Sequence, residues 1–233
     1  MRIRTKVSFT VSFLLALAAL VFAPPIFSAA GGGGGGISMP QIDTPRTPEE
    51  IAKQEYNSGV SYLKDVVKLD EKLATAKDEK QAKKINAKIA KAYEKALKSF
   101  TRAADRLPTM HDAWNMIGYS QRHLGDYNAS LAAYSKALEL KPNYPEAIEY
   151  RGEAFLGLNA VDDAKQAYLS LYGNARPLAG QLLTAMKIWV EHRKQDAQGV
   201  DGATVESFAT WINERSAIAA QTASTIGDPP ARW

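Results

Sequence analysis

The chain has 233 residues, no cysteine and a formal net charge of +4, from 29 Lys and Arg against 25 Asp and Glu. Three basic residues, Arg2, Arg4 and Lys6, lie at its start, so the remainder holds 26 basic side chains (29 minus 3) against 25 acidic ones. So small an excess does not indicate a nucleic-acid partner. The absence of cysteine excludes disulfides, a thiol nucleophile and a lipid-anchoring cysteine.

The N-terminal segment has the three parts of a secretory signal peptide. Basic residues precede an apolar stretch from Val7 to Phe22, and Ser28-Ala29-Ala30 supplies the small residues of a cleavage site. We therefore expect residues 1–30 to be a signal peptide of bacterial type and the mature protein to be periplasmic or secreted. An uncleaved N-terminal membrane anchor is the alternative, because no charged residue occurs between Val7 and Ile42.

Residues 31–46 are rich in glycine and proline, which is typical of a flexible tether. The glycines from Gly31 to Gly36 match a phosphate-binding loop by spacing alone, but no strand precedes them and no helix begins directly after them. Thr47-Pro48-Glu49-Glu50 combines a capping residue, a first-turn proline and acidic residues, which is the pattern of a helix start. We expect regular structure to begin near Thr47.

Residues 47–108 are predicted to form a long helical hairpin. Gly and Pro are absent from Val60 through Leu107, and apolar residues keep helical spacing on both sides of a polar stretch from Thr75 to Gln81. From Lys64 to Lys98 the hairpin carries eleven Lys against six Asp or Glu, an excess of five positive charges (11 minus 6). It either makes a weak contact with an anionic membrane or wall polymer, or presents a solvated face of interleaved Lys and Glu. That stretch has no Arg, so nucleic acid is not expected as a partner.

Residues 111 to 177 repeat a pattern with a period of 34 residues. The first copy is Trp114-x2-Ile117-Gly118-x5-Leu124-x5-Ser130-x3-Tyr134-x2-Ala137-x4-Pro142. The second copy, 34 positions later, has Ile148, Arg151, Gly152, Leu158, Ala164, Tyr168, Leu171 and Arg176. The pattern resembles the tetratricopeptide repeat (TPR), in which each unit is a pair of helices and neighbouring pairs stack into a solenoid. The first copy matches this family closely, whereas the second is degenerate and its closing proline is displaced to Pro177.

The same register extends upstream into the hairpin. Gly59 and Tyr62 occupy first-helix positions of a preceding repeat, and Ala96 and Phe100 occupy second-helix positions. Gly59 and Ala96 are 37 positions apart (96 minus 59) instead of about a dozen. We therefore expect residues 47–108 to be one repeat with both helices lengthened, and residues 109–177 to be two further repeats.

The resemblance assigns packing roles to a set of small and aromatic residues. Small side chains let two helices approach closely, and aromatic side chains fill the space between helix pairs. The expected packing residues are Gly59, Tyr62, Ala96, Phe100, Trp114, Gly118, Ser130, Tyr134, Pro142, Gly152, Ala164 and Tyr168.

Downstream of Pro177 the pattern weakens. Residues 178–224 are predicted to form a degenerate repeat or capping helix pair, with Trp189 on its first helix and Trp211 on its second, because a solenoid needs an atypical last unit to cover its apolar face. Residues 225–233 have no periodicity and are expected to be a flexible tail. The predicted fold is all-α: a short right-handed α-solenoid of TPR-like helical hairpins, with one extended hairpin and a C-terminal capping helix pair.

Patterns that indicate catalysis or metal binding are poor. The three histidines, His111, His123 and His192, have no partner at metal-ligand spacing, and no nucleophile elbow is present. We expect no catalytic residue, no metal site and no cofactor. An enzyme subunit is the least favoured alternative.

In TPR proteins, first helices of successive repeats line a concave groove that binds a partner. The matching positions here are Tyr56, Asp112, Asn115, Tyr119, Arg122, His123, Glu146, Glu149 and Glu153. The Lys and Asn arrangement that similar repeats use to hold a terminal carboxylate is not matched. The three glutamates are spaced by three and four, hence on one helical face, and suggest an extended partner segment that carries Lys or Arg. The alternative is an ordinary solvated face.

The expected function is thus that of a non-catalytic protein–protein interaction scaffold or adaptor of the cell envelope. Its partner is expected to be another protein or a peptide segment. The alternative is an envelope-associated structural factor that docks through its Lys-rich hairpin on an anionic membrane or wall surface. Partner identity and oligomeric state are not predicted.

Overall fold

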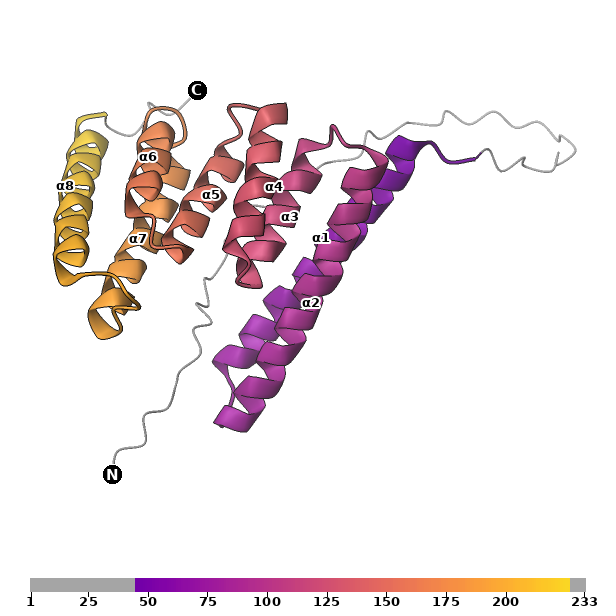
Figure 1. Cartoon of the computed structure of the whole chain (residues 1–233), viewed down its shortest axis with the longest axis horizontal. Helices are drawn as coiled ribbons and strands as arrows, with labels where there is room; N and C mark the ends of the chain where they lie inside the picture. Colours follow the sequence, from indigo (N-terminus) through magenta and orange to yellow (C-terminus); the bar gives the residue numbers. More distant parts are fainter. Residues whose placement is uncertain (1–44, 227–233) are drawn as a thin grey trace, which may run out of the picture. The chain divides into compact units, whose positions relative to one another are not determined.

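The computed structural model describes residues 45–226, and within them the regular structure is entirely α-helical (Figure 1). The helices are α1 (Pro48–Ala74), α2 (Glu79–Arg106), α3 (His111–His123), α4 (Tyr127–Leu140), α5 (Pro145–Gly157), α6 (Val161–Tyr172), α7 (Arg176–Gln195) and α8 (Gly202–Ile226). The predicted signal peptide, nearly all of the predicted tether and residues 227–233 lie outside the described residues. None of the helices within residues 45–226 is both long and apolar enough to cross a bilayer.

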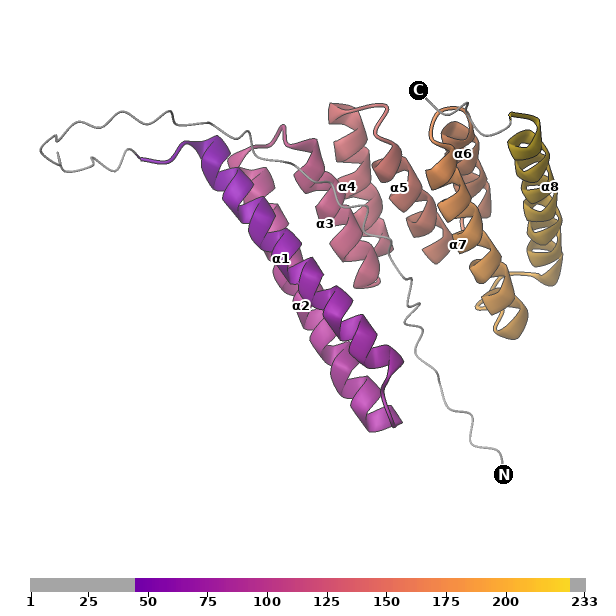
Figure 2. The same ribbon diagram turned by 180° about the vertical axis from the view of Figure 1, so that it is seen from behind.

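Successive helices pack as adjacent pairs, α1 with α2, α3 with α4, α5 with α6, and α7 with α8 (Figures 1 and 2). Neighbouring pairs are also in contact, through α2 and α3, α4 and α5, and α6 and α7. Every pair contributes large, fully buried side chains to the core, among them Phe100, Tyr134, Tyr168, Leu182 and Phe208. The predicted all-α, TPR-like solenoid is confirmed.

The first pair is much longer than the second. Helices α1 and α2 have 27 and 28 residues, whereas α3 and α4 have 13 and 14. At the far turn, the Asp78 carboxylate accepts a hydrogen bond from the Gln81 N–H (2.7 Å), and the Gln81 side chain accepts one from the Lys77 N–H (2.9 Å). These bonds satisfy N–H groups at the start of α2, which have no partner inside the helix.

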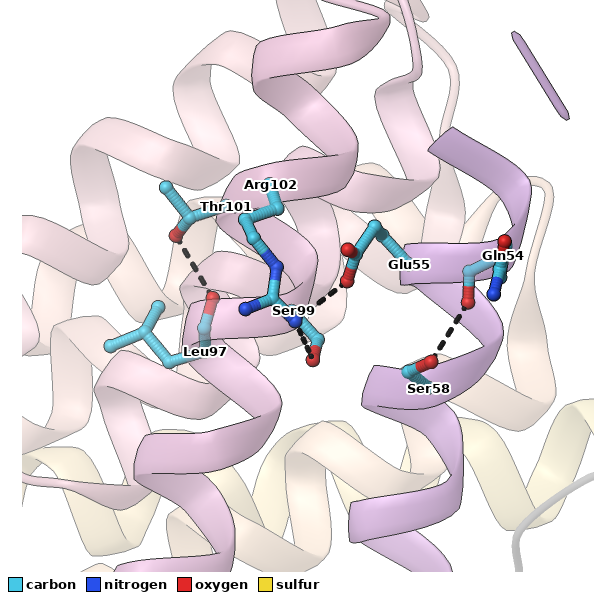
Figure 3. Close-up of polar contacts among 7 residues, drawn as sticks. All are labelled: Gln54, Glu55, Ser58, Leu97, Ser99, Thr101 and Arg102. Carbon is cyan, nitrogen blue, oxygen red and sulfur yellow. Dashed lines mark hydrogen bonds and ion pairs between the residues drawn. The ribbon is translucent and has the colours of Figure 1, made fainter. Parts of the chain in front are cut away.

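Polar contacts also join α1 and α2 nearer to the second pair. The Arg102 guanidinium on α2 donates a hydrogen bond to the Glu55 carboxylate on α1 at 2.7 Å (Figure 3). The same Arg102 nitrogen lies 3.3 Å from the Ser99 hydroxyl.

Two glycines of the expected packing set are covered by aromatic rings. A Cβ added at Gly59 would lie 2.5 Å from the Phe100 ring, and one added at Gly118 would lie 2.6 Å from the Tyr134 ring. Both distances are too short for real carbon atoms, so glycine is needed for these helices to pack at this separation. The glycine and the ring belong to the first and second helix of one pair in both cases.

The third pair differs at the equivalent place. A Cβ added at Gly152 would meet Leu182 of α7 at 2.6 Å, and not the Tyr168 ring that the register matches to Tyr134. The Tyr168 ring instead contacts Trp211 of α8, with ring centroids 5.4 Å apart. The degenerate repeat is thus completed by residues of the C-terminal helix pair.

Helix α7 also covers the C-terminal end of α5. The indole N–H of Trp189 donates a hydrogen bond to the Leu156 carbonyl at 2.8 Å, and the Arg193 side chain donates one to the Asn159 side-chain oxygen at 2.9 Å. Asn159 has a positive φ of 61°, as does Gly125 (84°) at the equivalent position 34 residues earlier. Both residues end a first helix in the left-handed conformation that glycine and asparagine tolerate best.

Trp114 lies between the second and third pairs. Its side chain packs against Ala137, Tyr144 and Ala147, and its indole N–H donates a hydrogen bond to the Pro108 carbonyl at 2.9 Å. Pro142 lies in the turn after α4, as the pattern predicts. The start of the expected tail, 225–233, needs correction, because α8 continues through Ile226.

Candidate functional site

The predicted groove residues lie on the first helices α1, α3 and α5. Tyr56 is in the third turn of α1; the α3 residues are Asp112, Asn115, Tyr119, Arg122 and His123, and the α5 residues are Glu146, Glu149 and Glu153. They form two groups. One is at the N-terminal ends of α3 and α5, and the other is farther along the same two helices.

The N-terminal group is built around the Asp112 carboxylate. The Tyr144 hydroxyl donates a hydrogen bond to Asp112 Oδ1 at 2.7 Å, and burial together with this bond holds the pKa of Tyr144 above its ordinary value. Burial, with a smaller contribution from the Asp112 charge, raises the pKa of Tyr56 to about 12. The Asp112 side chain is 40% exposed, and Glu146, in the first turn of α5, is half-buried. Both carboxylates therefore remain accessible from solvent.

The second group contains a stack of aromatic rings. The His123 ring lies parallel to the Tyr93 ring of α2, with centroids 4.6 Å apart, and 4.5 Å from the Tyr119 ring. Tyr119 in turn contacts Tyr150 of α5, at 5.1 Å between centroids. Burial, followed by the Arg122 charge, holds the pKa of His123 well below its usual range, so the ring is neutral at physiological pH.

Arg122 is the cation of this second group. Its guanidinium forms an ion pair with the Glu153 carboxylate, in which the two side chains are 14% and 12% exposed. It also lies over the Tyr119 and Tyr150 rings, at 5.4 and 5.7 Å from their centroids. Burial is the largest single influence and lowers the pKa of Arg122, but the Glu153 carboxylate together with the neighbouring tyrosines and Glu149 outweighs it, so the pKa is raised above its ordinary value.

Glu149 is buried next to this ion pair without a cation of its own. It is 2% exposed, and its Oε2 atom has no hydrogen-bond partner among the described residues. Burial, followed by the Glu153 charge, holds the pKa of Glu149 well above its usual range, which favours the protonated form. Asn115, at the equivalent position of α3, is also 2% exposed and has an unpartnered Oδ1 atom.

The acidic stripe suggested by Glu146, Glu149 and Glu153 needs correction. Only Glu146 presents an accessible, unpaired carboxylate, because Glu149 is buried and Glu153 is neutralised by Arg122. The reason is the close approach of α3 and α5. The Tyr119 ring of α3 meets the Tyr150 ring of α5 over these glutamate positions. Helical spacing alone had placed the glutamates on an open face.

Tyr93 and Tyr150 are members of the second group that were not among the predicted groove residues. Tyr150 precedes Glu153 by three positions, so helical spacing already placed it beside the candidate face. Tyr93 belongs to a second helix, and only the stacking of pairs brings it to His123.

No cluster of three or more metal-ligating side chains occurs within the described part of the chain. The arrangement described above consists of charged and aromatic groups. It can recognise a ligand by charge and by ring contacts.

Comparison with known proteins identifies the repeat itself. The tetratricopeptide repeat family model matches residues 111–144, which comprise α3, α4 and the turn after them. No curated protein matches the chain. The α3–α4 pair is thus similar to the tetratricopeptide repeat, and α1 with α2 and α5 with α6 pack beside it as further helical hairpins.

Proposed function

We propose that the chain binds an extended, basic segment of a partner protein across the N-terminal ends of α1, α3 and α5. TPR units are typically non-catalytic interaction modules, and a repeat of this family supports a protein–protein interaction scaffold in general. The basic character of the segment and its position on the surface are the finer parts of the proposal.

The accessible carboxylate of Asp112 is the observation that carries this proposal. The Tyr144 hydroxyl fixes Asp112 in position, and the side chain is still 40% exposed. Glu146 adds a second accessible carboxylate on the neighbouring first helix. A fixed acidic group binds an incoming cation with little loss of side-chain freedom, which favours a segment with Lys or Arg.

The neighbouring charges also favour a positively charged partner segment. Arg122 is paired with Glu153, so it does not offset Asp112 or Glu146. Tyr56, on the adjacent α1, is half-buried beside the Phe100 ring, and the part of its side chain that remains exposed would contact the apolar part of such a segment. His111 Nδ1 lies 3.2 Å from Asp112 Oδ1, so a protonated His111 would pair with this carboxylate, whereas Glu146 has no ion-pair partner among the described residues.

We also propose that the protein acts in the cell envelope, as a scaffold or adaptor without turnover. The signal-peptide pattern of residues 1–30 supports export. Fractionation of the producing cells and N-terminal sequencing of the mature chain test this part. A chain found in the cytoplasm with its N-terminus intact would refute it.

The groove proposal is tested by neutralising the accessible carboxylates. The variant Asp112→Asn with Glu146→Gln removes two negative charges at nearly constant shape. We expect it to lose a partner that the unmodified chain retains in crosslinking of the native envelope followed by mass spectrometry. Purified partner and chain should then show an affinity loss of about tenfold or more.

The matched control removes two acidic charges from second helices. Glu139 of α4 and Asp162 of α6 are 65% and 88% exposed, so Glu139→Gln with Asp162→Asn changes net charge equally, away from the groove. Retention by the control and loss by the groove variant is the expected result. Equal retention by both variants would refute the proposed surface.

A further inference from the structure

Helix α2 carries a single straight row of lysines. The row consists of Lys80, Lys84, Lys88, Lys91, Lys95 and Lys98. Successive members are separated by four, four, three, four and three residues, which averages to 3.6 and keeps all of them on one face of an α-helix. The row spans 18 residues (98 minus 80), or about 27 Å along the helix axis. All six side chains are exposed.

The row is free of acidic partners within the described chain. None of the six lysines forms an ion pair with another described residue, and the only ion pair of a hairpin lysine is the exposed one between Lys68 and Asp65 of α1. Lys95 lies over the Tyr62 ring, 5.4 Å from its centroid, and keeps its charge exposed. Glu94 lies three residues after Lys91 and four before Lys98, but it forms no ion pair with either lysine among the described contacts, so the Lys–Glu pairing of the solvated-face alternative is not realised here.

Arg102 shows the difference between a paired and an unpaired position. It lies four residues after Lys98 in the same register, but its guanidinium turns to Glu55 of α1 at 2.7 Å (Figure 3). Glu55 neutralises the charge at this position. Farther along the hairpin, none of the six lysines has such a partner among the described residues.

We infer that the lysine row of α2 docks the protein on an anionic phospholipid surface. This inference goes beyond the groove proposal and does not depend on it. A rigid row of ammonium groups gathers anionic headgroups beneath it, because lipids move laterally in the membrane and need no matching geometry. The contact is purely electrostatic, since every member of the row is a lysine.

The composition of the row disfavours two other anionic partners. Single-stranded nucleic acid is usually held by aromatic side chains that stack on bases, and the row has none. An acidic protein segment needs apolar or hydrogen-bonding anchors for a specific dock, and exposed ammonium pairs alone contribute little to such a contact. A lipid surface needs only charge density, which the row supplies.

The test uses the purified full chain and vesicles of defined composition. The fraction of chain that sediments is measured with vesicles that contain phosphatidylglycerol and with vesicles of phosphatidylcholine alone. Sedimentation with phosphatidylcholine alone reports any insertion of apolar segments. We expect binding that requires phosphatidylglycerol and weakens as salt is raised. The triple variant Lys84→Gln, Lys88→Gln and Lys91→Gln should weaken it by about tenfold to a hundredfold.

A matched control removes three lysines from the other helix of the same hairpin. Lys64, Lys68 and Lys72 of α1 are exposed but do not belong to the row, and replacing them with glutamine changes the net charge equally. The control should bind within about twofold of the unmodified chain, since charges beyond about 8 Å are screened at physiological salt. Circular dichroism confirms that both variants keep their helices.

Three results would overturn the inference. Equal loss in the two triple variants would show that net charge decides the binding. Unchanged binding by the α2 variant would show that the row takes no part. Binding of the chain to soluble polyglutamate but not to phosphatidylglycerol vesicles would assign the row to an acidic protein or polymer.

Discussion

Replacing Gly118 with alanine tests whether close approach of the two helices in a pair depends on a missing side chain. The new Cβ would lie 2.6, 2.7 and 2.9 Å from three atoms of the Tyr134 ring, where ordinary contacts begin near 3.4 Å. Tyr134 is fully buried, so its ring cannot move into solvent. Such overpacking costs about 1–3 kcal/mol, and the gain from alanine inside a helix, about 1 kcal/mol, offsets only part of it. Taking the middle of the overpacking range, about 2 kcal/mol, less this gain of about 1 kcal/mol, we expect a net loss of about 1 kcal/mol.

Gly180 provides the matched control, because it is exposed on α7 and nothing would lie within 4 Å of a Cβ added there. Gly180→Ala should therefore stabilise the fold by about 0.5–1 kcal/mol. Urea unfolding followed by far-ultraviolet circular dichroism compares both variants with the unmodified chain. A Gly118→Ala midpoint at or above that of the unmodified chain would refute the packing argument.

The buried charges predict three further outcomes in the same assay. Glu153→Gln leaves the buried Arg122 without its carboxylate and should lower the free energy of unfolding by about 3 kcal/mol; an unchanged midpoint would show that the ion pair is dispensable. The raised pKa of Glu149 means that stability from its protonated form is lost as pH rises through that pKa. Glu149→Gln should accordingly be more stable than the unmodified chain near pH 8, and the difference should shrink toward about pH 4.3. The same pH dependence of the free energy of unfolding in both chains would disprove this. The lowered pKa of His123 means that the neutral ring stabilises the fold above about pH 6.5, and that this stabilisation is lost as pH falls through the folded-state pKa. His123→Phe keeps a ring on Tyr93 but cannot be protonated. Its free energy of unfolding should therefore fall less at acidic pH than that of the unmodified chain.

Spacing along the sequence predicts the features that depend on contacts within one helix pair. The absence of Gly and Pro from Val60 through Leu107 predicted both lengthened helices, and the TPR register placed Gly59 and Gly118 in the packing set. These features are local. Helical periodicity decides which side chains share a face, and a short turn forces the two helices of a pair together.

Features that depend on contacts between pairs were not predictable in the same way. The register matches Gly152 to Tyr168, but Tyr168 turns to Trp211, which lies 43 residues later and outside the repeat (211 minus 168). Leu182 takes the place over the glycine. The sequence period ends before α7, so it carries no information about which residues complete the last repeat.

Burial of Glu149 has the same origin. Its spacing from Glu146 and Glu153 is correct for one helical face, but that face is closed by the meeting of Tyr119 and Tyr150 from adjacent first helices. A pattern on one helix does not report how near the next helix lies. The candidate surface consequently moves toward the ends of α3 and α5, where Asp112 and Glu146 remain accessible.

The chain is nearly neutral without its N-terminal basic residues, but its charges are unevenly distributed because the hairpin is long. Residues 64–98 carry eleven basic and six acidic side chains, whereas residues 99–226 carry twelve basic and fourteen acidic ones. Helix α2 is twice as long as α4, 28 residues against 14, and four lysines of the row, from Lys80 to Lys91, lie in its additional N-terminal half. Ile85 and Ile89 of the same half are buried, so the extension is held as a rigid element. Since charges are screened within about 8 Å at physiological salt, a partner at the groove and a surface at the hairpin each meet only the local charge. A repeat of ordinary length would lack most of the row, and lengthening the hairpin therefore adds a basic surface to the protein without changing the acidic one.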